Sequence, residues 1–190
     1  MLFCDHLTLQ EVLEAKQTDR EGLLAGLLID FRKTFPDLTF ELQLDFSIIN
    51  AQALRLANKQ LVTIYGGLAL HPRLGSDGLT LIILHEVGHH LAEGCRSKRD
   101  PSLACECAAD YWAVTAGLTN LRLRTDRSLQ VQVAVQELDA VLSPRQPSKG
   151  KYTKRNKSSG CWAGEWPSRR RSLLAKDRSP QTTGCCISNI

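Results

Sequence analysis

The 190-residue chain lacks the features that mark several special classes of protein. It has no apolar run of the roughly 18 residues that a membrane-spanning helix needs, so we expect no transmembrane segment. Its first residues, MLFCDHLTLQEVLEAKQ, contain no basic stretch followed by an apolar one, and we therefore expect no signal peptide and a cytoplasmic location.

A regular arrangement of cysteines is also missing. The seven cysteines form an odd set with no CxxC pair. Together with the expected absence of a signal peptide, this favours reduced thiols in a reducing compartment. We interpret Cys105 and Cys107 as small buried hydrophobic residues rather than as metal ligands.

Positive charge is concentrated near the C-terminus. Residues 143–190 hold 11 Lys or Arg and two acidic residues, whereas residues 1–142 hold 13 and 18. The basic segment is rich in Pro, Ser, Gly and Lys and lacks periodicity, so we predict a folded domain over 1–142 and a disordered tail over 143–190. Such a tail could contact nucleic acid or an anionic membrane. No basic surface with interleaved aromatic residues is found, and we expect no nucleic-acid binding.

The pattern of the first 142 residues predicts an α+β fold. Alternating apolar residues over 38–46, with Phe46 inward, and the β-branched stretch 60–67 predict two strands. Pro36 is expected to end the first helical segment. Ser76 or Asp77 is the expected N-cap of the central helix, and Gly94 its C-cap. The predicted helical segments cover residues 6–34, as one long helix or two shorter ones, and residues 78–93, 103–116 and 126–142.

The stretch LIILHEVGHHLAEG, residues 81–94, places costly polar side chains in an apolar helix. His85 and His89 are four residues apart, so their imidazoles share one face and can bind one ion. Glu86 is rotated by about 100° from His85 and lies beside the ion, where it can deprotonate a water. This is the H-E-x-x-H arrangement of zinc hydrolases. A metal would compensate the buried polar groups. His90 points elsewhere and is interpreted as a packing or surface residue.

The third ligand of a catalytic zinc site is expected in CECAADYWA, residues 105–113. Glu106 would complete a set of two histidines and a glutamate, with one zinc ion per chain. Asp110 lies one turn further and could accept a hydrogen bond from a ligand histidine. Small alanines around these acids would let the two helices approach closely. We interpret Trp112 as a core residue and His71 as a turn residue.

HEVGH followed by ECAAD resembles the gluzincin zinc metallopeptidases, whose signature is H-E-x-x-H … E-x-x-x-D. The resemblance covers about residues 50–117 and is closest to the CAAX prenyl protease-like type and its small soluble relatives, the minigluzincins. It implies a zincin-like fold with a small antiparallel sheet and a metal-binding helix pair. It also implies His85, His89 and Glu106 as zinc ligands, Glu86 as general base and Asp110 as the partner of a ligand histidine.

The same resemblance implies an edge strand at about residues 60–65 that pairs with an extended peptide or protein substrate. The substrate-binding residues would then be Thr63, Tyr65, Gly66 and Gly67. The residue that stabilises the oxyanion is not assigned, and Tyr65 and Tyr111 are candidates. The predicted function is hydrolysis of peptide bonds by a metal-activated water. The alternative is a zinc-stabilised module that binds a peptide without cutting it. The sequence does not indicate an oligomeric state.

Overall fold

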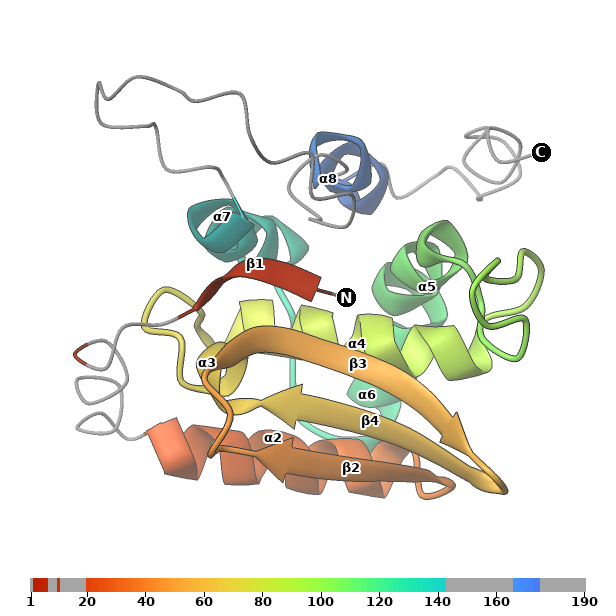
Figure 1. Ribbon diagram of the computed structural model, residues 1–190, viewed down its shortest axis with the longest axis horizontal. Helices are drawn as coiled ribbons and strands as arrows, with labels where there is room; N and C mark the ends of the chain where they lie inside the picture. The colour runs from red at the N-terminus through yellow and green to blue at the C-terminus, as the bar shows by residue number, and fades with distance from the viewer. Residues whose placement is uncertain (1, 7–9, 11–19, 143–165, 175–190) are drawn as a thin grey trace.

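The computed structural model describes residues 2–6, 10, 20–142 and 166–174. Together the elements form an α+β fold in which helices pack around a small sheet (Figure 1). In chain order they are β1 (Leu2–His6), α2 (Arg20–Thr34), β2 (Leu38–Gln43), β3 (Ile48–Leu56), β4 (Lys59–Tyr65), α3 (Gly66–Ala69), α4 (Ser76–Leu91), α5 (Glu106–Trp112), the π-helical turn η1 (Ala113–Gly117), α6 (Leu118–Arg124), α7 (Val131–Leu142) and α8 (Trp166–Leu174).

The sheet is mixed, with the strand order β1-β3-β4-β2. β2 pairs in parallel with β4, whereas β3 is antiparallel to both β4 and β1. The expected antiparallel sheet is therefore wrong, because the β3–β4 hairpin inserts β4 between β3 and β2. The sequence pattern missed β3, whose Ala, Asn and Gln residues are weak strand formers and depend on their cross-strand neighbours.

The prediction of an edge strand at residues 60–65 is also wrong. These residues lie in β4, which pairs with 38–43 on one side and with 51–56 on the other. Leu61, Val62, Thr63 and Ile64 are all buried, and a continuous buried run of this kind is typical of an interior strand. Their backbone groups are used within the sheet, so they are not an edge to which a peptide can add.

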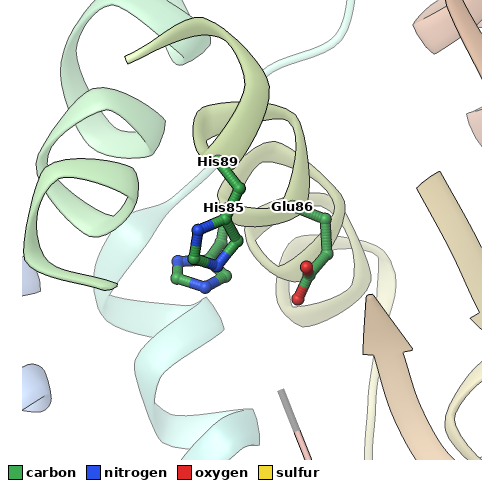
Figure 2. Close-up of side chains that lie close together, drawn as sticks. All are labelled: His85, Glu86 and His89. Carbon is green, nitrogen blue, oxygen red and sulfur yellow. The ribbon is translucent and has the colours of Figure 1, made fainter. Parts of the chain in front are cut away.

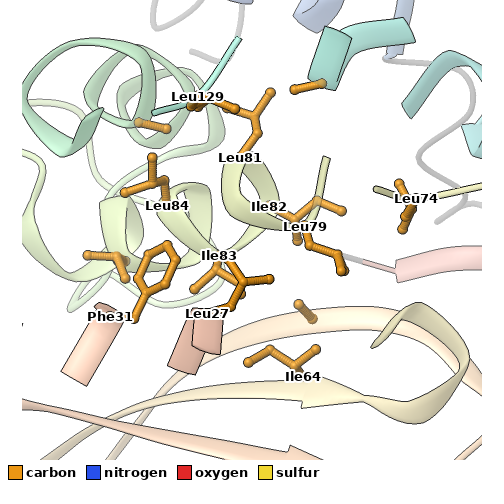
Figure 3. Packing of buried hydrophobic residues seen from close by; sticks show 14 of the residues in the cluster. Leu27, Phe31, Ile64, Leu74, Leu79, Leu81, Ile82, Ile83, Leu84 and Leu129 are labelled. Carbon is orange, nitrogen blue, oxygen red and sulfur yellow. The ribbon is translucent and has the colours of Figure 1, made fainter. Parts of the chain in front are cut away.

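The apolar core lies between the sheet, α2 and α4 (Figure 3). Phe31 of α2 and Ile64 of β4 meet Leu79 and Ile83 of α4 in this cluster. Every residue of α4 from position 78 to 90 is buried. A helix that is covered on all sides is an interior helix, and α4 therefore forms the centre of the molecule. Phe46, which was predicted to point inward, is 51% exposed.

The start of α4 is capped from another helix. Neither Ser76 nor Asp77 is the N-cap; that position is Gly75. Instead, Glu137 of α7 accepts hydrogen bonds from the backbone N–H groups of Gly75 and Gly78, at 2.8 and 2.7 Å. The negative carboxylate also suits the positive end of the helix dipole. At the other end the C-cap is Ala92 rather than Gly94.

Other helix boundaries also differ from the sequence expectation, among them the start of α7 at Val131 rather than near residue 126. α2 begins at Arg20 and ends at Thr34 before Pro36 as predicted, but His6, the first residue of the predicted helix, lies in β1. Gln10 is helical, and residues 7–9 and 11–19 of the predicted helix lie outside the described residues. The third predicted helix does not stop near Gly117 but continues through η1 and α6. Gly117 packs against the ring of Trp112, where a side chain would collide, so its role is close packing rather than helix termination.

The tail predicted to be disordered contains a helix, α8, which contacts α5 and α7 (Figure 1). Leu173 is 3% exposed and belongs to the main apolar cluster, and Arg169 is 5% exposed. The prediction of disorder is therefore wrong for residues 166–174, and the remainder of the tail lies outside the described residues. Within the described part of the chain, no helix is long and apolar enough to cross a membrane.

Candidate metal centre

The C-terminal half of α4 carries three buried polar side chains whose ligand atoms converge. His85, Glu86 and His89 each offer an atom within 4.8 Å of the others. Figure 2 shows the two imidazole rings together and the Glu86 carboxylate beside them, and the ring centroids are 4.5 Å apart. One helical turn separates the two histidines and brings both rings to the same side. This group could hold a metal ion.

Glu86 is the member of the group that core packing does not explain. Its side chain is 0% exposed, and neither carboxylate oxygen has a hydrogen-bond partner among the described residues. A buried carboxylate is strongly destabilising unless it is paired or hydrogen-bonded. Two imidazoles with a carboxylate form a donor set that divalent transition metals accept. The residues present therefore fit a metal ion.

Glu106 is brought to the same histidines by the first turn of α5. Its Oε2 lies 3.3 Å from Nε2 of His85, and its Oε1 lies 3.6 Å from Nε2 of His89. The Glu106 side chain is 40% exposed, in contrast to the buried histidines. The structure thus places the predicted third ligand near Nε2 of both histidines, on the solvent-accessible side of the group.

The remaining ring nitrogens have partners that fix how each histidine is oriented. Nδ1 of His85 lies 2.8 Å from Oδ1 of Asp110, and Nδ1 of His89 donates to the Ala104 carbonyl at 2.8 Å. Nδ1 of each ring is therefore occupied by an acceptor, and Nε2 is the ring nitrogen that faces Glu106. Asp110 was anticipated from its spacing. The Ala104 carbonyl was not, because a backbone acceptor leaves no signature in the sequence.

Arg169 of α8 is the site residue that the sequence analysis missed. Its Nε donates to Asp110 Oδ2 at 2.6 Å, and its Nη2 donates to Asp110 Oδ1. Its Nη1 donates to Glu106 Oε2 at 2.8 Å. Nη2 also lies 3.1 and 3.3 Å from the two ring nitrogens of His85. The only available signal was the run of three arginines in a tail that was predicted to be disordered.

The charges of this cluster shift the pKa values of its members. Burial and Arg169 act to lower the pKa of His85, but the carboxylates of Asp110 and Glu106 outweigh them and raise it to about 9. Burial, followed by the neighbouring His85, lowers the pKa of His89. Burial alone would raise the pKa values of Glu106 and Asp110. His85, Arg169 and His89 instead hold the pKa of Glu106 well below its usual range, and Arg169 and His85 lower that of Asp110. In the metal-free protein His85 is therefore protonated at neutral pH beside two ionised carboxylates.

Close contact between α4 and α5 makes this cluster feasible. A side chain at Gly88 would meet the backbone of Ala109 at 2.8–3.2 Å, closer than atoms normally approach. Ala108 and Ala109 are both buried on α5. The short distance between the helices allows the short side chains of Glu106 and Asp110 to reach the histidines.

The residues predicted to bind substrate do not join this cluster. Thr63 is 1% exposed within the interior strand β4, and the Tyr65 hydroxyl accepts a hydrogen bond from Gln52 of β3. Gly66 and Gly67 pack so tightly against the loop before β3 that a side chain would collide with its backbone. Close packing explains both glycines.

Other polar residues singled out in the sequence have structural positions. His90 is buried and donates from Nε2 to the Leu61 carbonyl at 3.0 Å, as expected for a packing residue. Cys105 and Cys107 are only half-buried, and Cys107 is disulfide-bonded, so the expectation of a reduced thiol is wrong there.

His71 is 7% exposed in the turn before α4. Trp112, predicted to be a core residue, is partly buried and packs against the edge of the core, with its ring centroid 5.8 Å from that of Phe35. Tyr111 is half-buried on α5.

Comparison with protein-family models, with curated proteins and with solved structures finds no significant match for this chain.

Proposed function

We propose that the protein is a zinc-dependent peptidase with a zincin-like active site. The observation that carries the proposal is Glu86, a fully buried carboxylate with no hydrogen-bond partner among the described residues, beside two histidines that offer metal ligands. A purely structural metal site has no need of an additional buried carboxylate. A hydrolase does, because a base must take the proton of the attacking water.

His85, His89 and Glu106 would hold the zinc ion. When bound, zinc would lower the pKa of water and polarise the peptide carbonyl. Three protein ligands are the number found in catalytic zinc sites, where a further position stays open. The partial exposure of Glu106 supports access to the cluster from solvent.

Residues around the proposed zinc ligands would transfer the proton and orient the two histidines. Glu86 takes a proton from the attacking water and passes it to the leaving amine. Asp110 and the Ala104 carbonyl accept the Nδ1 hydrogens of His85 and His89, which leaves Nε2 as the metal-binding atom of each. Hydrogen bonds of this type also keep the rings from rotating out of position.

The peptide substrate is proposed to pair with β3 rather than with β4. β1 pairs with β3 at residues 48 and 50, and no described strand pairs with the same edge over 51–56. β3 also contacts α4, the helix that carries Glu86. An extended peptide adds to such an edge through backbone hydrogen bonds.

The test compares wild type with Glu86→Gln, both loaded with zinc, and with the zinc-stripped protein. An amide is nearly isosteric with the carboxylate but cannot accept the proton of water. Zinc content is therefore expected to be unchanged, and cleavage of an extended-peptide library to fall by about 10²–10⁴-fold. Glu93→Gln is the matched control, since Glu93 is exposed beyond the end of α4.

Two results would contradict the peptidase. Equal cleavage by zinc-loaded Glu86→Gln would show that Glu86 is not the base. Peptide binding by both proteins with cleavage by neither would instead favour a zinc-stabilised binding module.

A further inference from the structure

α8 is held over the metal centre by both apolar and polar contacts. Leu173 inserts into the main apolar cluster, and Arg170 pairs with Asp139 of α7 at 2.8 Å between Nε and Oδ2. Arg169, on the same helix, reaches past α5 to the histidine side of α4. Figure 1 shows α8 beside α5 and α7. The helix therefore closes the centre with an arginine directed into it.

The guanidinium of Arg169 contacts the same atoms that would bind the metal. Nη1 lies 2.8 Å from Oε2 of Glu106, and Nη2 lies 3.3 Å from Nε2 of His85. Oε2 of Glu106 and Nε2 of His85 are themselves only 3.3 Å apart. Two of the proposed zinc-binding atoms are thus already in contact with a permanent cation.

The charge of the centre explains why a cation is needed there in either state. Glu86, Glu106 and Asp110 place three carboxyl groups around two buried histidines. A buried carboxylate is stable only when it is paired or bound to a metal. Arg169 supplies one positive charge and five N–H donors to this cluster, whereas a divalent ion would supply two charges.

We propose that Arg169 and the metal ion are alternative occupants of one cation site, so that α8 is a built-in competitor of metal binding. An arginine side chain does not lose its charge in proteins. A divalent ion at His85 and Glu106 would lie against it in a site of low polarity, where like charges repel strongly. Metal loading therefore releases Arg169 and loosens α8. The inference rests on the zinc site of the proposed function.

Because zinc and Arg169 compete for one site, zinc binding and the docking of α8 must affect each other equally. If docked α8 weakens zinc binding by some factor, bound zinc weakens the docking of α8 by the same factor. Release of α8 would also uncover the half-exposed Glu106 side of the cluster. The metal-free protein would be the closed form and the zinc-loaded protein the open form.

The first test measures zinc affinity of the full-length chain by competition with a chelator. Arg169→Gln is expected to bind zinc about 5–150-fold more tightly than wild type, the usual range for coupling between sites. Arg170→Gln removes the same charge from the same helix without touching the cluster. Its zinc affinity should stay within about twofold of wild type, because exposed ion pairs contribute little.

Arg169→Gln also removes a hydrogen-bond partner of Asp110 and could misfold for that reason, so a second variant is needed. Leu173→Ala weakens the docking of α8 while leaving every polar group of the cluster in place, and should also tighten zinc binding. In wild type, saturating zinc should speed hydrogen exchange of the backbone amides of 166–174 by a similar factor.

Opposite results overturn the inference in distinguishable ways. Zinc affinity that is equal or weaker in both folded variants, or α8 exchange that does not respond to zinc, would make Arg169 a positioning residue for Glu106 and Asp110. If wild type and all variants bind no zinc, the zinc site itself fails, and the competition proposed here fails with it.

Discussion

His89 and His90 are adjacent in sequence and both are buried in α4, yet they serve opposite parts of the molecule. His89 donates to the Ala104 carbonyl and directs its other nitrogen toward Glu106. His90 donates to the Leu61 carbonyl of β4, and its Nδ1 has no hydrogen-bond partner within the described residues. One imidazole therefore joins a cluster of charged groups, and the other joins the helix to the sheet.

The difference shows that burial alone does not indicate which histidine belongs to the charged cluster. Burial lowers the pKa of both residues, so both are neutral near pH 7. The distinguishing property is what lies at the second ring nitrogen. Near His89 this is a carboxylate and a second imidazole, whereas Nδ1 of His90 has no hydrogen-bond partner within the described residues. The predictions below test this distinction.

Removing His89 should produce the largest effect on metal binding. Zinc sites bind with about 10–16 kcal/mol shared among roughly four ligands, so loss of one ligand should weaken affinity by about 10²–10³-fold. His89→Ala should therefore lose most of its zinc in elemental analysis. Equal zinc in wild type and His89→Ala would show that the site lies elsewhere.

The pH dependence of stability should separate His85 from His90. The pKa of His85 in the folded metal-free protein is about 9, above its ordinary 6.5. Its stabilising contribution is complete below pH 6.5 and is lost as the pH rises through about 9. One pKa unit corresponds to about 1.4 kcal/mol, so the loss is on the order of 3 kcal/mol.

Urea denaturation with a chelator, at several pH values between 6 and 9.5, measures this loss. His85→Gln should abolish it, whereas His90→Leu should retain it because His90 is already neutral. A loss that persists in His85→Gln would assign it to another group.

Asp110→Ala should weaken zinc binding by about 10–100-fold, as loss of the hydrogen-bond partner of a ligand histidine does. The measurement belongs in the Arg169→Gln background, because Asp110 also holds Arg169 and its removal would loosen α8. Unchanged affinity in that background would mean that His85 keeps its orientation without Asp110.

The smallest effect is expected at His90, and on stability rather than on zinc. His90→Leu leaves the Leu61 carbonyl without its donor, which should lower the free energy of unfolding by about 1–3 kcal/mol. Zinc affinity should remain close to that of wild type. A marked loss of zinc in the folded variant would remove the contrast between the two histidines.

The parts of the centre that could be predicted are those encoded by helical spacing. His85, Glu86 and His89 lie on one helix, and Glu106 and Asp110 lie one turn apart on the next, so local periodicity places each group. The α+β class followed from similar local patterns. The order of the strands could not be predicted, because the sequence of β4 is compatible with a strand at the edge or in the interior of a sheet.

Arg169 shows why the rest could not be predicted. It lies 63 residues from Glu106 and 59 from Asp110, in a basic segment without the apolar periodicity that marks a docked helix. Only the buried Leu173 and the ion pairs of the folded chain reveal its position. Contacts across such sequence distances depend on tertiary packing rather than on local preference.

The contact between Gly88 and Ala109 limits how this centre could be engineered into another protein. The ligand residues alone would not reproduce it, because their reach depends on two helices that touch through backbone atoms. A designer would have to transfer the pair of helices with Gly88 and its neighbouring alanines as one unit. The small residues near the proposed ligands are therefore as much a part of the motif as the proposed ligands themselves.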